Sequence, residues 1–357
     1  MLVTLTLGAG FASRIQQSST AGRSAALGRA RADAGLVVPV DAAAAPAGLP
    51  GDVAISPPPD QFDGPAVTEA PPGALARGRF PGVVPSGGTW AVMIGINNYP
   101  GSRHDLRSAV ADALDVDEAL ARMGVPGNHR LVVKDGQAAA RVVTLAADWL
   151  VAHAGPDAVA VFFYAGHVRK VGGGTEAVIA ADGNAVTDAT LADHLRPLQA
   201  RQAWIGIAAC YGGGFTELLA PGRVLSAAAS ANRLAYENAA FGRSYMVQFM
   251  VREAMIEGRA NASVQHSFDY AKATIAYRYP GREPVEIDSG SGPLSLRPPG
   301  AGPPSTVKPA PKPAPAPANS GGGSNPPPPS SPPSGGSGSG SSGGTCKSVN
   351  LGVIRCR

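Results

Sequence analysis

Continuous apolar runs alternate with segments of helical periodicity through the middle of the chain. The runs at 90–96, 158–164 and 203–209 are typical of strands that are covered on both faces. Apolar residues recur at helical spacing over 105–123 and 138–153. Strands that alternate with helices predict an α/β fold, in which right-handed crossovers build a mainly parallel central sheet with helices on both faces.

Shorter patterns complete the expected domain. Most are bounded by Gly, Pro, Asn or Asp, the residues that commonly end strands and helices. The further predicted elements are strands at 129–133, 176–181 and 224–229 and helices at 187–198, 241–257 and 264–279. All of these elements together place one folded domain at 89–290, which is long enough to bury a core of its own.

The segments on either side of this domain differ from it in composition. Residues 13–88 and 291–344 are rich in Ala, Gly, Pro and Ser and lack sustained apolar periodicity. Such segments bury too little apolar surface to fold by themselves. We therefore expect a disordered pro-segment at 13–88 and a linker at 291–344, stiff in its Pro-rich part and flexible in its Gly/Ser part.

The two ends of the chain bear on its location. Residues 2–12 are apolar and end in small residues, like the tail of a secretory signal peptide, but the positively charged start of such a peptide is missing. Either the start lies upstream, or this is an ordinary apolar N-terminus. Within 345–357, Cys346 and Cys356 bracket a short loop and predict a small disulfide hook, the alternative being two unpaired thiols. A hook would fit an extracytoplasmic or secreted protein.

Charge and composition narrow the function classes. The chain has 30 Lys and Arg against 26 Asp and Glu, a formal net charge of +4. These charges are scattered, and no basic stripe is interleaved with aromatic residues, so nucleic-acid binding is not expected. No stretch reaches the roughly 18 apolar residues of a membrane span. No metal-ligand spacing lies near the candidate residues described next, so no metal or other cofactor is predicted.

Two reactive residues directly follow predicted strands. His167 ends the segment FFYAGH, and Cys210 follows the run that ends in Ala208 and Ala209. In parallel sheets, sites form beyond the carboxyl ends of the strands, where a cysteine nucleophile and a histidine base can meet. Taken singly, Cys210 could be a small buried hydrophobe and His167 an ordinary loop histidine.

Several motifs in consistent order resemble one family. WAVMIGINNY at 90–99, followed by DLRSAVADALDVDEALARMGVP at 105–126, resembles the start of a caspase-like domain of the metacaspase/orthocaspase type, in peptidase family C14. FFYAGHV resembles the histidine motif of that family, and AACYGGGF resembles its cysteine motif. VLSAAASANRLAYE at 224–237 resembles the strand and loop that follow. The similarity spans about 90 to 290.

The resemblance implies a caspase-haemoglobinase fold and a cysteine endopeptidase. His167 aligns with the catalytic histidine of the family and Cys210 with its nucleophile. The backbone N–H groups of Val168 and Cys210 align with the oxyanion hole. Asp112 matches an aspartate that, in metacaspase relatives, helps to line the pocket for a basic side chain at P1, the residue before the scissile bond.

Three positions depart from the family pattern. Ala208 stands where the family has an aspartate that also helps to bind a basic P1 residue, so half of the acidic pocket is missing. Val168 replaces a glycine, although a valine still carries the backbone N–H. Gly212 replaces a serine.

The sequence therefore predicts an exported cysteine endopeptidase with a Cys-His dyad that acts on protein or peptide substrates, with a basic P1 preference put in doubt by Ala208. If that preference holds, Arg77 and Arg79 are candidate self-processing sites. The alternative is a catalytically silent caspase-like module that binds or acts as a scaffold. The C-terminal tail could also contact a cell surface. Some metacaspase relatives need calcium, but no acidic cluster here allows a calcium site to be assigned.

Overall fold

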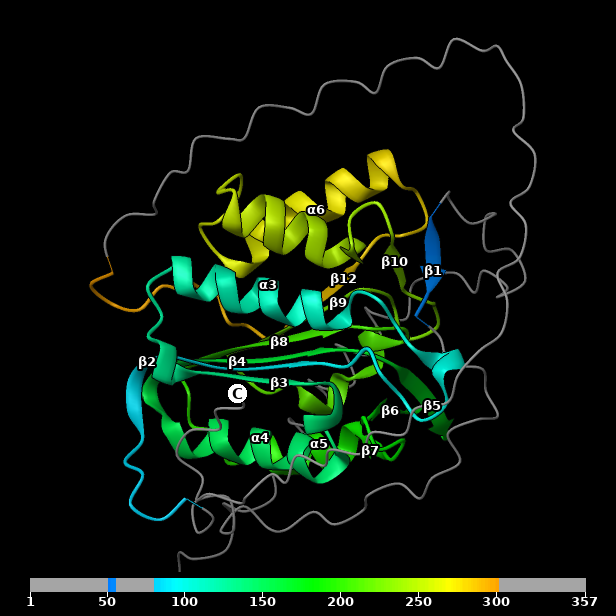
Figure 1. Ribbon diagram of the computed structural model, residues 1–357. Coiled ribbons are helices and arrows are strands. Elements are labelled where there is room, and N and C mark those ends of the chain that lie inside the picture. The colour runs from blue at the N-terminus through cyan, green and yellow to red at the C-terminus, as the bar shows by residue number, and fades with distance from the viewer. Residues whose placement is uncertain (1–50, 56–79, 302–357) are drawn as a thin grey trace, which may run out of the picture. The chain divides into compact units, whose positions relative to one another are not determined.

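A six-stranded sheet runs through the centre of the molecule (Figure 1). The computed structural model describes residues 51–55 and 80–301. The strand order is β12-β9-β8-β4-β2-β3, and β12 is the one strand of this sheet that runs antiparallel to its neighbour. The strands are β2 (Ser86–Gly95), β3 (Arg130–Lys134), β4 (Ala154–Ala165), β8 (Gln202–Ala208), β9 (Arg223–Ala227) and β12 (Val285–Asp288).

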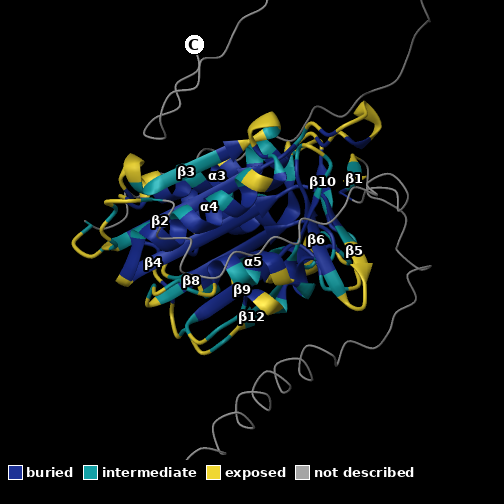
Figure 2. Cartoon of the chain, turned by 90° about the horizontal axis from the view of Figure 1, so that it is seen from below, coloured by how far each residue is buried: buried dark blue, intermediate teal, exposed yellow. Residues whose placement is uncertain are grey.

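Helices cover both faces of this sheet (Figure 1). One face carries α3 (Ala109–Arg122), the helix η7 (Val247–Ile256), which has π-type hydrogen bonds, and α6 (Val264–Arg278). The other face carries α4 (Ala140–His153) and α5 (Asp188–Leu195). Because both faces are covered, the inner strands are buried almost throughout, as Figure 2 shows. The predicted α/β fold with a mainly parallel sheet and helices on both faces is confirmed.

Short single turns connect these elements near the carboxyl ends of the strands and elsewhere. They are η2 (Ser102–His104), η3 (Gly127–His129), η4 (Asp135–Gln137), η5 (Gly212–Gly214) and η6 (Thr216–Leu218). Helix α3 begins at Ala109, four residues later than its apolar period predicts. The preceding residues form a loop instead, and the carboxylate of Glu237 accepts the N–H of Ser108 at 2.9 Å, just before the helix starts.

Two small antiparallel sheets flank the central one. One consists of β5 (Val168–Gly172), β6 (Thr175–Ile179) and β7 (Ala185–Thr187). The other consists of β1 (Asp52–Ala54), β10 (Tyr236–Asn238) and β11 (Arg243–Ser244). Figure 1 shows β1 and β10 beside each other. Of these six strands the sequence pattern predicts only β6, because β1, β7, β10 and β11 have two or three residues each and β5, VRKVG, lacks a period of two.

The described parts of the expected pro-segment are not disordered. Residues 51–55 contain β1, which pairs with β10, and β2 already begins at Ser86. Strand pairing satisfies backbone groups that composition alone leaves out of account. The remaining residues of 13–88 lie outside the described part of the chain, as do residues 2–12, Arg77 and Arg79, Cys346 and Cys356.

The packed domain also extends beyond the expected boundary at 290. Leu294 and Leu296 are buried, the N–H of Val264 donates to the carbonyl of Leu294 at 2.9 Å, and Thr89 Oγ1 donates to the carbonyl of Leu296 at 3.0 Å. Two leucines within a Pro/Gly-rich stretch thus suffice to hold it on the domain. Among the described residues, no helix is both long and apolar enough to cross a membrane.

Candidate active site

The backbone of His167 is held by two tyrosine hydroxyl groups. His167 lies two residues beyond the end of β4, and its N–H donates to the hydroxyl of Tyr99 at 2.9 Å. The hydroxyl of Tyr164 lies 2.8 Å from the carbonyl oxygen of His167. Gly166 is required here because a Cβ at this position would lie 2.5 Å from the Tyr164 hydroxyl oxygen and 2.6 Å from that of Tyr99. The two tyrosines and the glycine fix where the imidazole leaves the chain.

The His167 ring is buried between two backbone carbonyl groups. Its Nδ1 lies 2.5 Å from the carbonyl oxygen of Ile55, and its Nε2 lies 2.7 Å from that of His104. A neutral imidazole carries one ring proton, so it donates to only one of them at a time. Burial lowers the pKa of His167 from its ordinary value, and the two carbonyl groups oppose this shift only in part.

The thiol of Cys210 is enclosed. Cys210 follows β8 by two residues and is 0% exposed. Its Sγ accepts the N–H of Ala235 at 3.0 Å. Burial raises the pKa of this thiol to about 12, although the backbone of Ala235 and that of Ile55 lower it in part. Tyr211, the next residue, has a left-handed backbone with φ of 58°, a conformation that costs free energy and recurs at functional sites.

Ile55 and Ala235 connect the two candidate catalytic residues. Ala165 pairs with Ala208, and His167 and Cys210 each follow these paired residues by two positions, so both leave the sheet at the same level. The N–H of Ile55 donates to the carbonyl of Ala235 at 3.0 Å. Hydrogen bonds therefore run from Sγ of Cys210 through Ala235 and Ile55 to the ring of His167.

The other predicted site residues are also buried. Val168 begins β5, directly after His167. Ala208 ends β8 and places a methyl group beside the nucleophile. Asp112 lies in the first turn of α3, where its carboxyl accepts the N–H of Ser244 at 3.1 Å. Burial raises the pKa of Asp112 to about 8.

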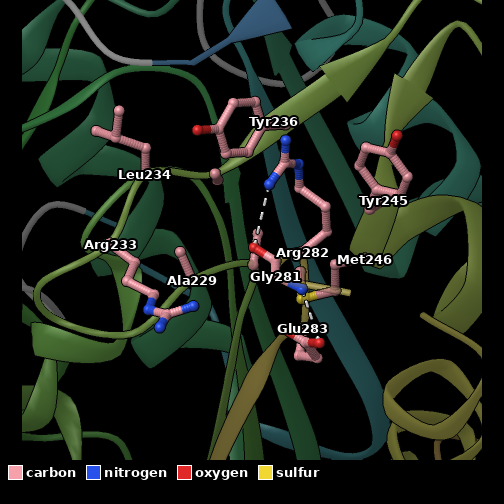
Figure 3. A pocket seen from close by; sticks show the side chains of 11 residues that line it. Ala229, Arg233, Leu234, Tyr236, Tyr245, Met246, Gly281, Arg282 and Glu283 are labelled. Carbon is pink, nitrogen blue, oxygen red and sulfur yellow. Dashed lines mark hydrogen bonds between the residues drawn. The ribbon is translucent and has the colours of Figure 1, made fainter. Parts of the chain in front are cut away.

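A pocket lies beside the nucleophile. Figure 3 shows Arg282 with its guanidinium against the ring of Tyr236, and its Cζ lies 3.9 Å from the ring centroid. Ala235, whose N–H bonds to the thiol, is also part of the wall. The remaining lining residues include Ala229, Arg233, Leu234, Tyr245, Met246, Gly281 and Glu283, and Asp112 is not among them.

Three residues of this site were not predicted from the sequence: Ile55, Tyr99 and Tyr164. A tyrosine near the end of a fully apolar strand needs a partner for its hydroxyl, and that signal was present at Tyr164. Ile55 stands in the alternating stretch Asp52 to Ile55, but nothing local links it to a cysteine 155 positions later.

The described residues show no gathering of three or more His, Cys, Asp and Glu side chains that could hold a metal ion.

Comparison with known proteins identifies the family of the chain. The family model described as Peptidase_C14, caspase domain, matches residues 89–290. No curated protein gave a significant match. The solved structure of protein GSU0716 from Geobacter sulfurreducens is 14% identical, with a TM-score of 0.48, and the match covers 59% of this chain and 97% of that one. Because the family model covers more than half of the sequence, the chain belongs to the caspase domain family of cysteine peptidases, C14.

Proposed function

We propose that the chain is a cysteine endopeptidase in which Cys210 is the nucleophile and His167 is the general acid and base. One observation supports this most strongly. The main chain of Ile55 lies against both residues as the peptide of a substrate would, with its N–H on the carbonyl of Ala235 and its carbonyl oxygen on the imidazole. A site that binds peptide backbone between a thiol and an imidazole is suited to acyl transfer.

The proposed reaction passes through a thioester. His167 takes the proton of the Cys210 thiol. The thiolate attacks the carbonyl carbon of the scissile peptide, and the negative charge moves to the carbonyl oxygen. The backbone N–H groups of Cys210 and Val168 stabilise this oxyanion, and one such donor is worth about 100- to 1,000-fold in rate. The C–N bond then breaks as His167 gives its proton to the leaving amine. A water, deprotonated by His167, attacks the thioester and releases the acid and the thiol.

Under this proposal, the structure is a closed form of the enzyme. A thiol with a pKa of about 12 holds almost no thiolate at neutral pH, and the thiolate is the nucleophile. Ile55 occupies the place between Cys210 and His167 that a substrate needs. Activity therefore requires that residues 51–55 leave, which exposes the thiol to water and returns its pKa toward the ordinary range.

The P1 preference remains part of the proposal. A basic P1 residue is what the family resemblance implies through Asp112, with the second acid replaced by Ala208. Ile55 stands where the P1 residue of a substrate would stand. An enzyme whose P1 pocket accepts basic side chains would cleave poorly after isoleucine. A segment that binds like a substrate but offers the wrong P1 residue would stay intact in the site.

A catalytically silent binding module is the second candidate. Two observations favour it: Cys210 is fully buried, and Ala208 provides no acid. In that case residues 51–55 would be a permanent part of the fold, and Cys210 a core residue.

Peptide hydrolysis by the full chain separates the two. The substrates are fluorogenic tetrapeptides that vary at P1, assayed with and without calcium. The proteins are the wild type, Ile55→Ala to loosen the closing segment, and Ile55→Ala combined with Cys210→Ala or His167→Ala. Hydrolysis by Ile55→Ala that is lost in both double variants supports the peptidase, and the preferred P1 residue tests the role of Asp112. A folded Ile55→Ala chain that alkylates at Cys210 yet cleaves no peptide favours the binding module.

We also propose that the protein is extracytoplasmic, with its C-terminal hook available for contact with a cell surface. The support is the apolar segment at 2–12 and the pair Cys346 and Cys356. The chain has three cysteines, so thiol titration of the denatured, unreduced protein from its native source gives one thiol if the hook is closed. Three thiols would contradict it.

A further inference from the structure

The segment from Asp52 to Ile55 binds to the domain as an added strand. It pairs antiparallel with β10, with Asp52 opposite Asn238 and Ala54 opposite Tyr236. β1 and β10 lie side by side in Figure 1, although the two strands are far apart in the sequence. Strand addition of this kind is a common way to hold an extended peptide, with affinity from the main chain and specificity from side-chain pockets.

The register of this pairing relates each residue of the segment to the reacting groups. Ile55 has its main chain at Cys210 and His167. Asp52 therefore lies three residues on the N-terminal side of the residue at the nucleophile. Val53, which lies between them, is 38% exposed, so its side chain contributes little to binding along β10.

The side chain of Asp52 is held by four hydrogen-bond donors. Its Oδ2 accepts from Nε and Nη2 of Arg282, each at 3.0 Å. Its Oδ1 accepts from the hydroxyl of Tyr245 at 2.6 Å and from Nδ2 of Asn238 at 2.9 Å. The side chains of Asp52 and Arg282 are each 2% exposed. Such a site is built for a carboxylate, because charge-assisted bonds from a guanidinium are among the strongest in proteins.

The guanidinium is positioned independently of the acid it binds. The ring of Tyr236 lies under it, and Nδ2 of Asn238 also reaches the Tyr245 hydroxyl at 3.0 Å. Arg282, Tyr236 and Tyr245 line the pocket of Figure 3. If the segment leaves, the domain retains an arginine with its donors aimed at the groove. A buried charge without a partner is costly, so a peptide with a carboxylate at this place is strongly favoured.

We propose that Arg282, Tyr245 and Asn238 form a substrate subsite for an acidic side chain, three residues before P1, and that Asp52 occupies it in the closed form. This rests on the proposed function, since it takes the groove between β10 and the thiol to be the peptide-binding groove. Substrates of the enzyme carry Asp or Glu at this position, and residues 52–55 compete with them for the site.

Peptide binding to an inactive full chain tests this without any need for catalysis. The probes are fluorescent acetyl-Asp-Val-Ala-Ile-amide and its Asn-Val-Ala-Ile counterpart, measured by anisotropy. The protein is Asp52→Asn with Cys210→Ala, because the internal acid otherwise competes at a high effective concentration. The Asp peptide is expected to bind about 10- to 100-fold more tightly than the Asn peptide, as a charged hydrogen-bond network implies. Adding Arg282→Gln abolishes the difference.

Equal binding of the two peptides by the folded Asp52→Asn, Cys210→Ala chain contradicts the proposed subsite. The same pair of peptides is titrated against an Ile55→Ala, Cys210→Ala chain, which keeps Asp52 and therefore guards against misfolding of Asp52→Asn. The loosened segment still competes there, but it weakens the binding of both peptides by the same factor and leaves their ratio unchanged. There too the Asp peptide binds more tightly if the subsite exists, and equal binding contradicts it.

Hydrolysis then separates this inference from the proposed function. In Asp52→Asn chains that retain Cys210, the ratio of kcat/KM for Asp and Asn substrates reports the subsite during turnover. Selective binding without hydrolysis of any peptide supports the subsite and contradicts the proposed peptidase activity. Hydrolysis at equal rates for Asp and Asn substrates supports the peptidase activity and contradicts the subsite.

Discussion

The carbonyl oxygen of Ile55 lies 2.5 Å from Nδ1 of His167, although 112 positions separate the two residues in the chain. Through this contact, docking of residues 51–55 and closure of the candidate active site are one event. Any change that loosens the docked segment should therefore appear first at the imidazole and the thiol. The reactivity of Cys210 thus reports how firmly the segment is docked.

Ile55→Ala should accelerate alkylation of Cys210 by iodoacetamide. Truncating a buried isoleucine costs about 2 to 5 kcal/mol when the site cannot collapse, and here the cost falls on the docked form. A loss of about 2 kcal/mol raises the population of the released form, and with it the labelling rate at pH 7.5, by about 30-fold. Mass spectrometry of the Cys210 peptide gives the rate.

Val53→Ala is the matched control for that experiment. Val53 belongs to the same strand but is partly exposed, so its truncation should change the rate by less than about threefold. Equal acceleration by both variants would show that the effect is general fraying of β1 and not loss of the contact at the site.

The pH dependence of labelling should differ between the wild type and Ile55→Ala. In the docked form burial raises the pKa of Cys210 to about 12, whereas a released, solvated thiol ionises at about 8.5. A raised pKa in the docked form means that docking is fully favoured below about pH 8.5 and weakens as the pH rises toward 12. The rate for the released variant should therefore level off above about pH 8.5, while the wild-type rate keeps climbing.

His167 sets the lower limit of the pH range in which docking is fully favoured. Burial lowers its pKa in the docked form, so docking is fully favoured above the ordinary value of about 6.5 and weakens as the pH falls through the lowered one. The ratio of variant to wild-type labelling rates should thus be largest between about pH 6.5 and 8.5. A ratio that is constant from pH 5 to 10 would show that the two groups do not titrate with docking.

Much of the fold was predictable because its signals are local. The strands that carry His167 and Cys210 are continuous apolar runs, and the helices between them show a clear period. The part that was missed is non-local. Nothing in the short stretch from Asp52 to Ile55 shows that it will pair with β10, because its partner lies more than 180 positions away. A rule based on composition then classed it with the Ala-, Gly- and Pro-rich residues around it.

The site was predictable to the same degree. Two reactive residues at strand ends, together with the family motifs, were enough to select His167 and Cys210. The state of the site was not, because burial, pKa and the occupant of the groove depend on residues from distant elements. Arg282 illustrates this: in the sequence it is one of many scattered basic residues, and only the fold places it against Tyr236 and Asp52.

Tyr99→Phe should weaken catalysis more than folding. The change removes the acceptor of the His167 N–H, which costs about 1 to 3 kcal/mol at a buried site. In the loosened Ile55→Ala background we expect kcat to fall by at least about tenfold, with KM nearly unchanged, because the imidazole is displaced and not the peptide groove. Tyr236→Phe, which keeps the ring under Arg282, is the control and should leave kcat within about twofold. A rise in KM alone would contradict a positioning role for Tyr99.

Gly166→Ala should disrupt the same support by crowding. The added Cβ would meet two tyrosine oxygens well inside contact distance, so the structure must shift, at a cost of about 1 to 3 kcal/mol. Gly136→Ala is the control, since a Cβ added there would meet nothing within 4 Å beyond its chain neighbours. Urea denaturation should show a lower midpoint for Gly166→Ala and a change of less than about 0.5 kcal/mol for Gly136→Ala. Similar midpoints for the two would mean that the backbone at Gly166 relaxes freely.

Asp112→Asn should reveal whether this carboxyl is held neutral. Its pKa in the fold is about 8, against about 3.9 in an unfolded chain. Because the folded value is raised, the wild type loses stability as the pH rises from about 4 to 8, whereas the asparagine variant does not titrate. The urea midpoint of the variant should thus rise relative to that of the wild type between about pH 4 and 8, and the difference should be constant above about pH 8. A constant difference would show an ionised Asp112 at all these pH values, which is the state that a pocket for a basic P1 residue requires. Only in that second case should Asp112→Asn, in the Ile55→Ala background, selectively lower kcat/KM for substrates with Arg at P1.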